Sequence, residues 1–419
     1  MTASQTSAGG NLRVDAARLW DALMEMAKIG ATAKGGCDRQ TLTDLDRQGR
    51  DLFAKWCADA GMTMTVDAMG TMFARRAGAD ESLAPVLLGS HLDTQPTGGK
   101  FDGVLGVLGA LEVARTLNDL GVRTRRPIEV VNWTNEEGAR FAPSMIASGV
   151  FAGRYNLEEA LDIRDLAGAR FGDELARIGY AGDAPVGGRA VHAYIELHIE
   201  QGPILEDEGI DIGVVTHAQG LRWYEFNLTG FESHAGSTPM KGRRDALVGA
   251  ARIVESVRRI ALAHPPGAVG TCGVIEARPG SRNVIPGSVF LTAEFRCPDG
   301  AALEAMDRAL REDAQAIAAA EGLTFDMRET ANYAPIPFDP AMVETVRRAA
   351  RDLGFSARDI VSGAGHDACW MAQVCPTSMI FTPCVGGISH NEAEAISPEW
   401  ARAGADVLLR AALEAAEPV

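Results

Sequence analysis

The chain has 419 residues, of which 46% are hydrophobic and 23% are charged, a composition typical of globular proteins. This length suggests two domains, because a single hydrophobic core stops growing well before this size. No stretch reaches the ~20 consecutive apolar residues that cross a bilayer. The formal net charge of −16 argues against nucleic acid as the main partner. We therefore expect a protein that acts on neither membranes nor nucleic acids.

Two features of the sequence indicate a cytoplasmic location. The start of the chain, MTASQTSAGGNLRVDAARLW, contains no basic segment followed by an apolar one, so we expect no secretory signal. The small polar side chains of residues 1–10 predict a disordered tail. The seven cysteines include no Cys-x-x-Cys pair, which indicates reduced thiols rather than disulfides or a cysteine-type zinc site.

Up to residue 217 the chain alternates between helical and strand patterns. Apolar residues at helical spacing predict helices over 12–29, 44–60 and 104–120. Apolar or alternating runs predict strands over 64–66, 72–73, 85–89, 127–133 and 193–202. Strands that alternate with helices in this way predict an α/β fold with a mainly parallel sheet covered on both faces.

The pattern changes beyond residue 218. Strands and helices then follow in the order β-α-β-β-α-β, which is typical of a ferredoxin-like α+β domain. The predicted elements are 222–229, 243–262, 269–277, 288–296, 301–321 and 323–328. Helices over 340–353 and 398–415, with a strand over 377–381, return to the first pattern. We therefore expect an α/β domain made of residues 1–217 and 333–419, interrupted by an α+β domain of residues 218–332.

Four clusters of histidine and carboxylate residues each lie where a predicted strand ends. Ligands of α/β sheets bind in the loops just past the carboxyl ends of strands, so these clusters are candidates for one site. Taken singly, each cluster has an ordinary explanation, such as a hydrogen-bonded turn, a solvated helix start or a core histidine. The clusters contain His91, Asp93, Asp102, Glu136, Glu137, His198 and His390.

The residue types in these clusters indicate a metal site. Histidines with carboxylates and without cysteine suit zinc, manganese, cobalt or nickel. Because adjacent side chains point in different directions, one of Glu136 and Glu137 could bind a metal while the other faces the substrate as a general base. Asp93 is placed two residues after His91 to orient its imidazole.

Seven motifs, in order, resemble the hydantoinase/carbamoylase family of dinuclear-metal amidases. That family comprises N-carbamoyl-L-amino-acid hydrolases, β-ureidopropionases and allantoate amidohydrolases, and the resemblance runs from about residue 15 to 415. It implies that the first domain is catalytic and that the inserted domain serves as a lid and dimerisation domain. The motifs are GSHLDTQPTGGKFDG, TNEEGARF, ELHIEQGP, SHAGSTPM, RNVIPG with AEFR, GAGHDA and SHNE.

The resemblance implies two divalent metal ions per subunit, Zn²⁺ or else Mn²⁺, Co²⁺ or Ni²⁺. One ion would be held by His91, Asp102 and His198. The other would be held by Asp102, Glu137 and His390, so that Asp102 bridges the pair. Glu136 would be the general acid and base.

The resemblance also implies contacts with the substrate, from Gln201, His234, Asn283, Arg296, Gly365 and His366. His234 would reach the active site of a partner subunit and help bind the oxyanion, so we expect a homodimer. Asn283 and Arg296 would hold the substrate carboxylate. Arginine suits this role because its planar fork donates two parallel hydrogen bonds.

A site of this kind suits hydrolysis of the ureido C–N bond of an N-carbamoyl amino acid, which gives amino acid, carbon dioxide and ammonia. The motif HLDTQPTGGKFDG resembles the carbamoylases and ureidopropionases more than the allantoate enzymes, so it favours this reaction over the alternative, allantoate amidohydrolase. A hydrolase of N-acyl amino acids or dipeptides, which would release no ammonia, is a further alternative. A non-catalytic metal-dependent binding protein and a plain α/β protein with surface acids also stay open.

Overall fold

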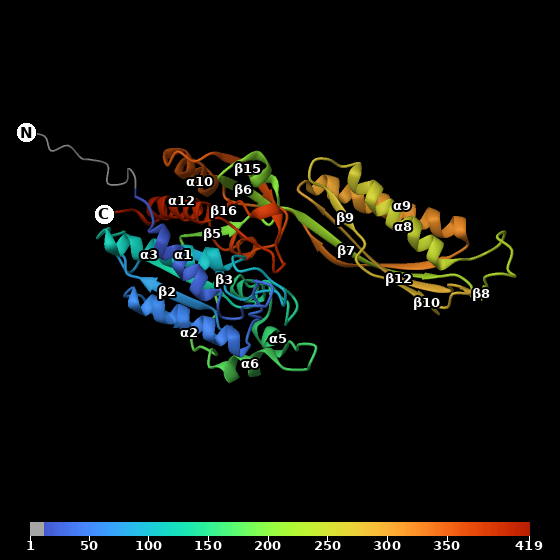
Figure 1. Ribbon diagram of the computed structural model, residues 1–419, viewed down its shortest axis with the longest axis horizontal. Coiled ribbons are helices and arrows are strands. Elements are labelled where there is room, and N and C mark those ends of the chain that lie inside the picture. Colours follow the sequence, from blue (N-terminus) through green and yellow to red (C-terminus); the bar gives the residue numbers. More distant parts are fainter. Residues whose placement is uncertain (1–11) are drawn as a thin grey trace, which may run out of the picture. The chain divides into compact units, whose positions relative to one another are not determined.

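The computed structural model describes residues 12–419, which divide into two compact units (Figure 1). The first unit runs to Thr216 and resumes at Pro337, and the second is His217–Ile336. The tail predicted over residues 1–10 lies outside the described residues. No helix within residues 12–419 is long and apolar enough to cross a membrane.

Within the described residues, nine strands form the sheet of the first unit, in the order β1-β2-β4-β3-β5-β16-β6-β14 with β15 paired to β6. The central strands β4, β3, β5 and β16 are parallel. The predicted mainly parallel α/β fold is confirmed, but β1, β2 and β6 pair antiparallel, which the sequence did not predict. The strands are β1 Thr63–Val66, β2 Met72–Arg76, β3 Val86–His91, β4 Ile128–Trp133, β5 Ala193–Ile199, β6 Ile212–Ala218, β14 Ile336–Pro337, β15 Ala357–Ser362 and β16 Thr377–Thr382.

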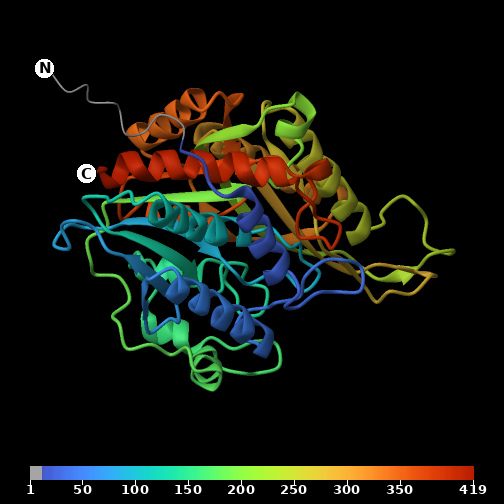
Figure 2. The same ribbon diagram turned by 60° about the vertical axis from the view of Figure 1, so that its left-hand side comes forward.

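The central strands are buried along their whole length, since β3, β4, β5 and β16 contain only buried residues. Parallel sheets need cover on both faces, and helices supply it. Helices α1, α3 and α12 pack against one another on one face, while α2 lies against β1 and α11 against β5 and β16 (Figures 1 and 2). This cover is the reason that even the polar residues of β5, Glu196 and His198, are buried.

Several helices of the first unit begin at a polar residue whose side chain accepts a hydrogen bond from a backbone N–H of the first turn. The Thr43 side chain accepts a hydrogen bond from Asp46 N, which begins α2, and Ser397 begins α12 in the same way. Three short helices, α4 to α6, form a small separate core that the sequence patterns did not predict. The helices are α1 Ala16–Met26, α2 Asp44–Asp59, α3 Val104–Asp119, α4 Ile146–Phe151, α5 Leu157–Asp162, α6 Phe171–Ile178, α7 Ile204–Glu208, α10 Pro340–Asp352, α11 Asp367–Met371 and α12 Pro398–Ala416.

The second unit, all of whose residues are described, is an antiparallel sheet in the order β10-β12-β7-β13, with β9 also paired to β12. Helices α8 and α9 pack on it and share one hydrophobic core with it. β12 alternates between buried and half-buried residues, which is the pattern of a strand with one covered face. The elements are β7 Gly220–Thr229, β8 Ser233–His234, α8 Ala246–Leu262, β9 Val269–Thr271, β10 Ile275–Arg278, β11 Val284–Ile285, β12 Ser288–Cys297, α9 Gly300–Glu321 and β13 Thr324–Tyr333.

One strand prediction in this unit was wrong in detail. Residues 269–277 form two strands, β9 and β10, rather than one. The break lies around Val274, whose N–H donates to the Thr292 hydroxyl while its carbonyl accepts from Thr292 N. A local irregularity of this kind leaves no signal in the alternation of apolar residues.

Candidate metal centre and active site

The predicted metal ligands lie at one edge of the central sheet. His91 ends β3, His198 lies near the end of β5, and Glu137 follows β4. These strands are parallel neighbours in the order β4-β3-β5, so their carboxyl ends meet. His390 comes from the loop after β16, the next parallel strand, and Asp102 from the loop that precedes α3. Strands distant in sequence thus deliver their ligands to one place.

One group of ligand atoms consists of His91, Asp102 and His198, which are all buried. Asp102 Oδ1 lies 3.1 Å from His198 Nε2 and 3.9 Å from His91 Nε2. Two ligands of one tetrahedral ion with bonds near 2.0–2.1 Å stand about 3.3 Å apart. The spacing of these atoms therefore fits a single divalent ion.

A second group consists of Asp102, Glu137 and His390. His390 Nε2 lies 3.3 Å from Asp102 Oδ2 and 3.3 Å from Glu137 Oε2. Asp102 therefore directs one carboxylate oxygen to each group. This arrangement suits a carboxylate that bridges two ions.

Backbone carbonyls orient the imidazoles of both buried histidines. His91 Nδ1 donates to the carbonyl of Asp93 at 2.9 Å, and His198 Nδ1 donates to the carbonyl of Ile199 at 3.0 Å. A proton held on Nδ1 leaves Nε2 with its lone pair toward the metal position. Each ring is thus fixed in the tautomer that binds a metal.

The carboxylate of Asp93 does a different job from the one predicted. It lies 3.9 Å from His91 Nδ1, beyond hydrogen-bond distance. Its two oxygens accept instead from the backbone N–H groups of Glu136 and Glu137, each at 3.3 Å. The reason is the fold of the loop after β4, which turns these two N–H groups toward Asp93. Asp93 therefore orients the histidine through its carbonyl and the two glutamates through its side chain.

Glu136 lies beside the first ligand group, with Oε2 3.5 Å from His91 Nε2. Burial and the nearby carboxylates of Asp367 and Glu137 raise its pKa well above the ordinary glutamate value. Burial and Asp102 likewise raise the pKa of Glu137 to about 8. Divalent cations at this place would offset the repulsion, because they put positive charge among the carboxylates. The electrostatics of the site therefore agree with its donor atoms.

The structure brings two of the predicted substrate contacts next to the metal ligands. Gln201 Nε2 donates to Asp102 Oδ2 at 2.9 Å. His366 is buried, and its ring centroid lies 4.5 Å from that of His198. His366 Nε2 is 2.8 Å from the Ser362 hydroxyl. Gly365 leads into this histidine, and a Cβ there would lie 2.9 Å from the Met145 methyl.

The other predicted contacts belong to the second unit, where they lie in two places. Asn283 and His234 are neighbours, since Ala235 N donates to the Asn283 carbonyl at 2.8 Å and β8 pairs with β11. Arg296 lies at the far end of β12. From Ser288 to Arg296 the strand covers about 26 Å at about 3.3 Å per residue. The second unit therefore does not bring Arg296 together with His234.

The imidazole of His234 is held in one tautomer. Its Nδ1 accepts hydrogen bonds from Gly236 N at 3.0 Å and Ser237 N at 3.1 Å. In the neutral ring the proton must then lie on Nε2. His234 is thus an exposed side chain that presents a hydrogen-bond donor.

Sequence reasoning missed several buried polar residues behind the ligands. Glu196 accepts from Ser90 Oγ at 2.7 Å, Tyr194 OH at 3.0 Å and Ala368 N at 3.0 Å, and so ties β3, β5 and α11 together. Glu196 and His198 alternate with apolar residues in β5, and all residues of this strand are buried. The ligand atoms of Glu196, His198 and His366 also lie within 4.8 Å of one another. The residues missed are the buried Ser148, Glu196, Asp367 and Glu394 and the half-buried Ser389.

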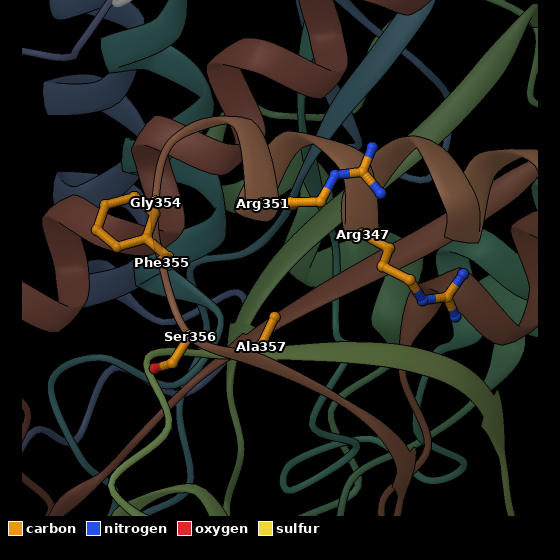
Figure 3. Close-up of a pocket in the computed structure, with 6 residues that line it drawn as sticks. All are labelled: Arg347, Arg351, Gly354, Phe355, Ser356 and Ala357. Atoms are coloured by element: carbon orange, nitrogen blue, oxygen red, sulfur yellow. The ribbon is translucent and has the colours of Figure 1, made fainter.

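A surface pocket beside α10 is separate from this centre. Its lining contains no predicted site residue, and Arg347 in it is paired with Asp359 at 2.8 Å (Figure 3). We assign no function to it. The lining residues are Arg347, Arg351, Gly354, Phe355, Ser356 and Ala357.

Comparison with known proteins places the chain in a family. The sequence profile of peptidase family M20/M25/M40 matches residues 87–414. The chain therefore belongs to this family, whose members typically bind divalent metals.

Within the family, the resemblance predicted from the motifs is confirmed. The chain is 59% identical over 411 residues to an N-carbamoyl-L-amino-acid amidohydrolase from Rhizobium meliloti, covering 98% of this chain and 99% of the relative. The solved structure of an amidase of the hydantoinase/carbamoylase family from Burkholderia multivorans is 61% identical in sequence and matches with a TM-score of 0.93. The match covers 97% of this chain and 100% of that one. An allantoate amidohydrolase from Bacillus subtilis is 32% identical over 392 residues, which cover 91% of this chain and 93% of that relative.

Proposed function

We propose that this protein hydrolyses the ureido C–N bond of N-carbamoyl-L-amino acids, giving the amino acid, carbon dioxide and ammonia. The observation that carries the proposal is the pair of ligand groups that share Asp102, with Glu136 beside them. The 59% identity to an enzyme of that name, over nearly the whole chain, supports the same substrate class. The site is thus proposed as that of a metal-dependent amidohydrolase.

The cofactor would be two divalent ions per subunit, Zn²⁺ or else Mn²⁺, Co²⁺ or Ni²⁺. His91, Asp102 and His198 would hold one ion, and Asp102, Glu137 and His390 the other. When bound, such ions lower the pKa of water and polarise a carbonyl oxygen. The donor atoms and the buried carboxylates described above both support this assignment.

Glu136 would move the proton during hydrolysis. Its carboxylate takes a proton from the attacking water and later returns it to the nitrogen that leaves as ammonia. The remaining carbamate loses carbon dioxide to give the amino acid.

Residues of the second unit would bind the parts of the substrate that carry negative charge. Arg296 and Asn283 would hold the α-carboxylate, and Gln201, Gly365 and His366 of the first unit would contact the rest of the substrate. His234 would donate from Nε2 to the oxyanion, a role that its tautomer allows. These assignments follow the match between this sequence and the family motifs.

We infer a homodimer in which His234 and its neighbour Asn283 serve the site of the partner subunit, while Arg296 serves the site of its own chain. The separation of about 26 Å between the two ends of β12 supports this, because a small substrate cannot touch both ends of one unit. The second unit, proposed as an inserted lid and dimerisation domain of about residues 218–332, also has a suitable surface. Ile275 of its edge strand β10 and the preceding Val274 are exposed, and so are Leu247, Val248 and Val254 of helix α8.

The second candidate function is allantoate amidohydrolase. The relative from Bacillus subtilis favours it, and allantoate hydrolysis also releases ammonia from a ureido group. We place either activity in the cytoplasm, since all seven cysteines lie in the described residues as free thiols.

Ammonia release by metal-reconstituted protein tests the proposal. The panel would contain several N-carbamoyl-L-amino acids, N-carbamoyl-β-alanine, allantoate and one N-acetyl amino acid, with chelator-treated protein as the control. We expect ammonia from the N-carbamoyl-L-amino acids and none after chelation. Ammonia from allantoate alone would replace the proposal with the second candidate. Cleavage of the N-acetyl compound alone would contradict both.

A further inference from the structure

Two of the proposed metal ligands lie in loops that the sheet does not hold directly. Asp102 belongs to the loop between β3 and α3, and His390 to the loop between β16 and α12. Neither residue is part of a strand, unlike His91 and His198. Some contact must therefore fix these two loops relative to each other if Asp102 and His390 are to face the same ion.

Glu394 makes that contact. Its Oε1 accepts from Phe101 N at 2.9 Å and from Asp102 N at 3.1 Å, across 292 residues of sequence. Its Oε2 lies 3.1 Å from the hydroxyl of Ser389, the residue before His390. The side chain is 2% exposed. One carboxylate thus joins the backbone of the Asp102 loop to the loop that carries His390.

The hydrogen bonds around Asp102 Oδ2 complete this connection. Gln201 Nε2 lies 2.9 Å from Asp102 Oδ2 and 3.1 Å from Ser389 Oγ, and its two protons can serve both. Ser389 Oγ is also 2.9 Å from Asp102 Oδ2, but its single proton can go to one carboxylate at a time. With Gln201 donating to Asp102, the Ser389 proton is available to Glu394.

The glycine at position 99 is a second, independent sign that Glu394 must occupy this place. A Cβ on Gly99 would lie 1.9 Å from Glu394 Cδ and 2.0 Å from its Oε1. No side chain fits at that distance, so a residue other than glycine would displace the carboxylate. The Gly-Gly of the PTGGKFDG motif therefore makes room for Glu394.

We propose that Glu394 is a positioning residue that holds the Asp102 loop and the His390 loop in the arrangement that binds both metal ions. The inference rests on the proposed metal centre. Glu394 touches no predicted substrate position and acts through Asp102, Ser389 and His390. Partners that orient metal ligands in this way typically change metal affinity 10–100-fold when they are replaced.

The test is the affinity of the metal-free full-length protein for Mn²⁺, measured by competition with a chelator. We expect Glu394→Gln to bind Mn²⁺ about 10–100-fold more weakly than the wild type. Excess Mn²⁺ should restore most of the activity, because every ligand is still present. The matched control is Glu392→Gln in the same loop, whose side chain pairs with Lys34 at 3.4 Å and makes none of these contacts. Its Mn²⁺ affinity should not change.

Gly99→Ala provides a second variant that removes no polar group. It should weaken Mn²⁺ binding as Glu394→Gln does, because it displaces the same carboxylate. Thermal unfolding of the metal-free proteins shows whether either variant has lost its fold. Wild-type Mn²⁺ affinity in both folded variants would overturn the inference and leave the proposed function intact. A wild-type protein that bound neither Mn²⁺ nor Zn²⁺ would contradict the metal centre itself, and the inference with it.

Discussion

The candidate metal centre in the first unit and the His234 segment in the second unit are built in different ways. The ligands of the centre are mostly buried at the ends of covered strands, and backbone groups fix their orientation. His234 is exposed in the two-residue strand β8, which pairs with β11, and the hydrogen bonds to its ring come from Gly236 and Ser237 of its own loop. Groups that bind cations and move protons gain from burial and fixed geometry. A group that must meet a separate chain has to stay on the surface.

This contrast predicts that the buried side of the site carries the largest effect on turnover. Glu136→Gln keeps the shape of the side chain but cannot accept a proton. We expect it to bind metal as the wild type does and to lose about 10³-fold or more in kcat. Ammonia release and metal content of the same preparation measure the two quantities. Glu136 would not be the base if this variant turned over at a near-normal rate.

Replacing the exposed His234 should lower turnover less than replacing Glu136, and a second subunit should be able to supply the missing histidine. His234→Ala should lower kcat about 10²-fold, the usual effect of losing one oxyanion donor. If His234 serves the partner, mixing His234→Ala with Glu136→Gln subunits rebuilds one complete site in each mixed dimer.

Subunit mixing gives this prediction a numerical outcome. Randomly mixed dimers should recover about a quarter of the wild-type activity, because half of them are mixed and each has one complete site of two. The unmixed variants are the controls. No recovery in mixtures that contain mixed dimers, as shown by affinity capture of a tag carried by one variant only, would mean that His234 acts within its own chain.

The surface of the second unit should decide assembly without touching the centre. Ile275→Lys replaces the exposed isoleucine of β10, an edge strand, with a charge, and lysine there opposes pairing with another edge. We expect size-exclusion chromatography to show a shift from dimer to monomer. Activity should fall about 10-fold or more if His234 must reach a partner. Asp326→Lys, on the opposite edge strand β13, is the control. An active monomer would refute the shared site.

The smallest effect should be on substrate binding through Arg296. Arg296→Lys keeps the charge but loses the two parallel donors, so KM should rise about 10-fold with little change in kcat. Arg308→Lys, an exposed position on α9 of the same unit, should leave KM unchanged. An unchanged KM in Arg296→Lys would remove this residue from the carboxylate site.

Much of the first unit could be predicted because its strands have a strong local signal. The runs that form β3 and β4 are mainly apolar and buried throughout, since both faces of those strands are covered. The strand order could not be predicted, because antiparallel pairing of β2 with β4 depends on contacts between segments far apart. The short helices α4 to α6 were missed because six to eight residues contain too few turns to show a period.

The candidate site also has one part that could be predicted from the sequence and another that could not. Residue types indicated a metal site, because donor chemistry is a property of each side chain, and the resemblance carried by the motifs predicted the ligand set and Glu136. Only the folded chain showed that Asp102 directs one oxygen to each ligand group and that the Asp93 carboxylate holds two backbone N–H groups. Glu394 became visible only there, because its contacts join loops 292 residues apart that have no periodicity of their own.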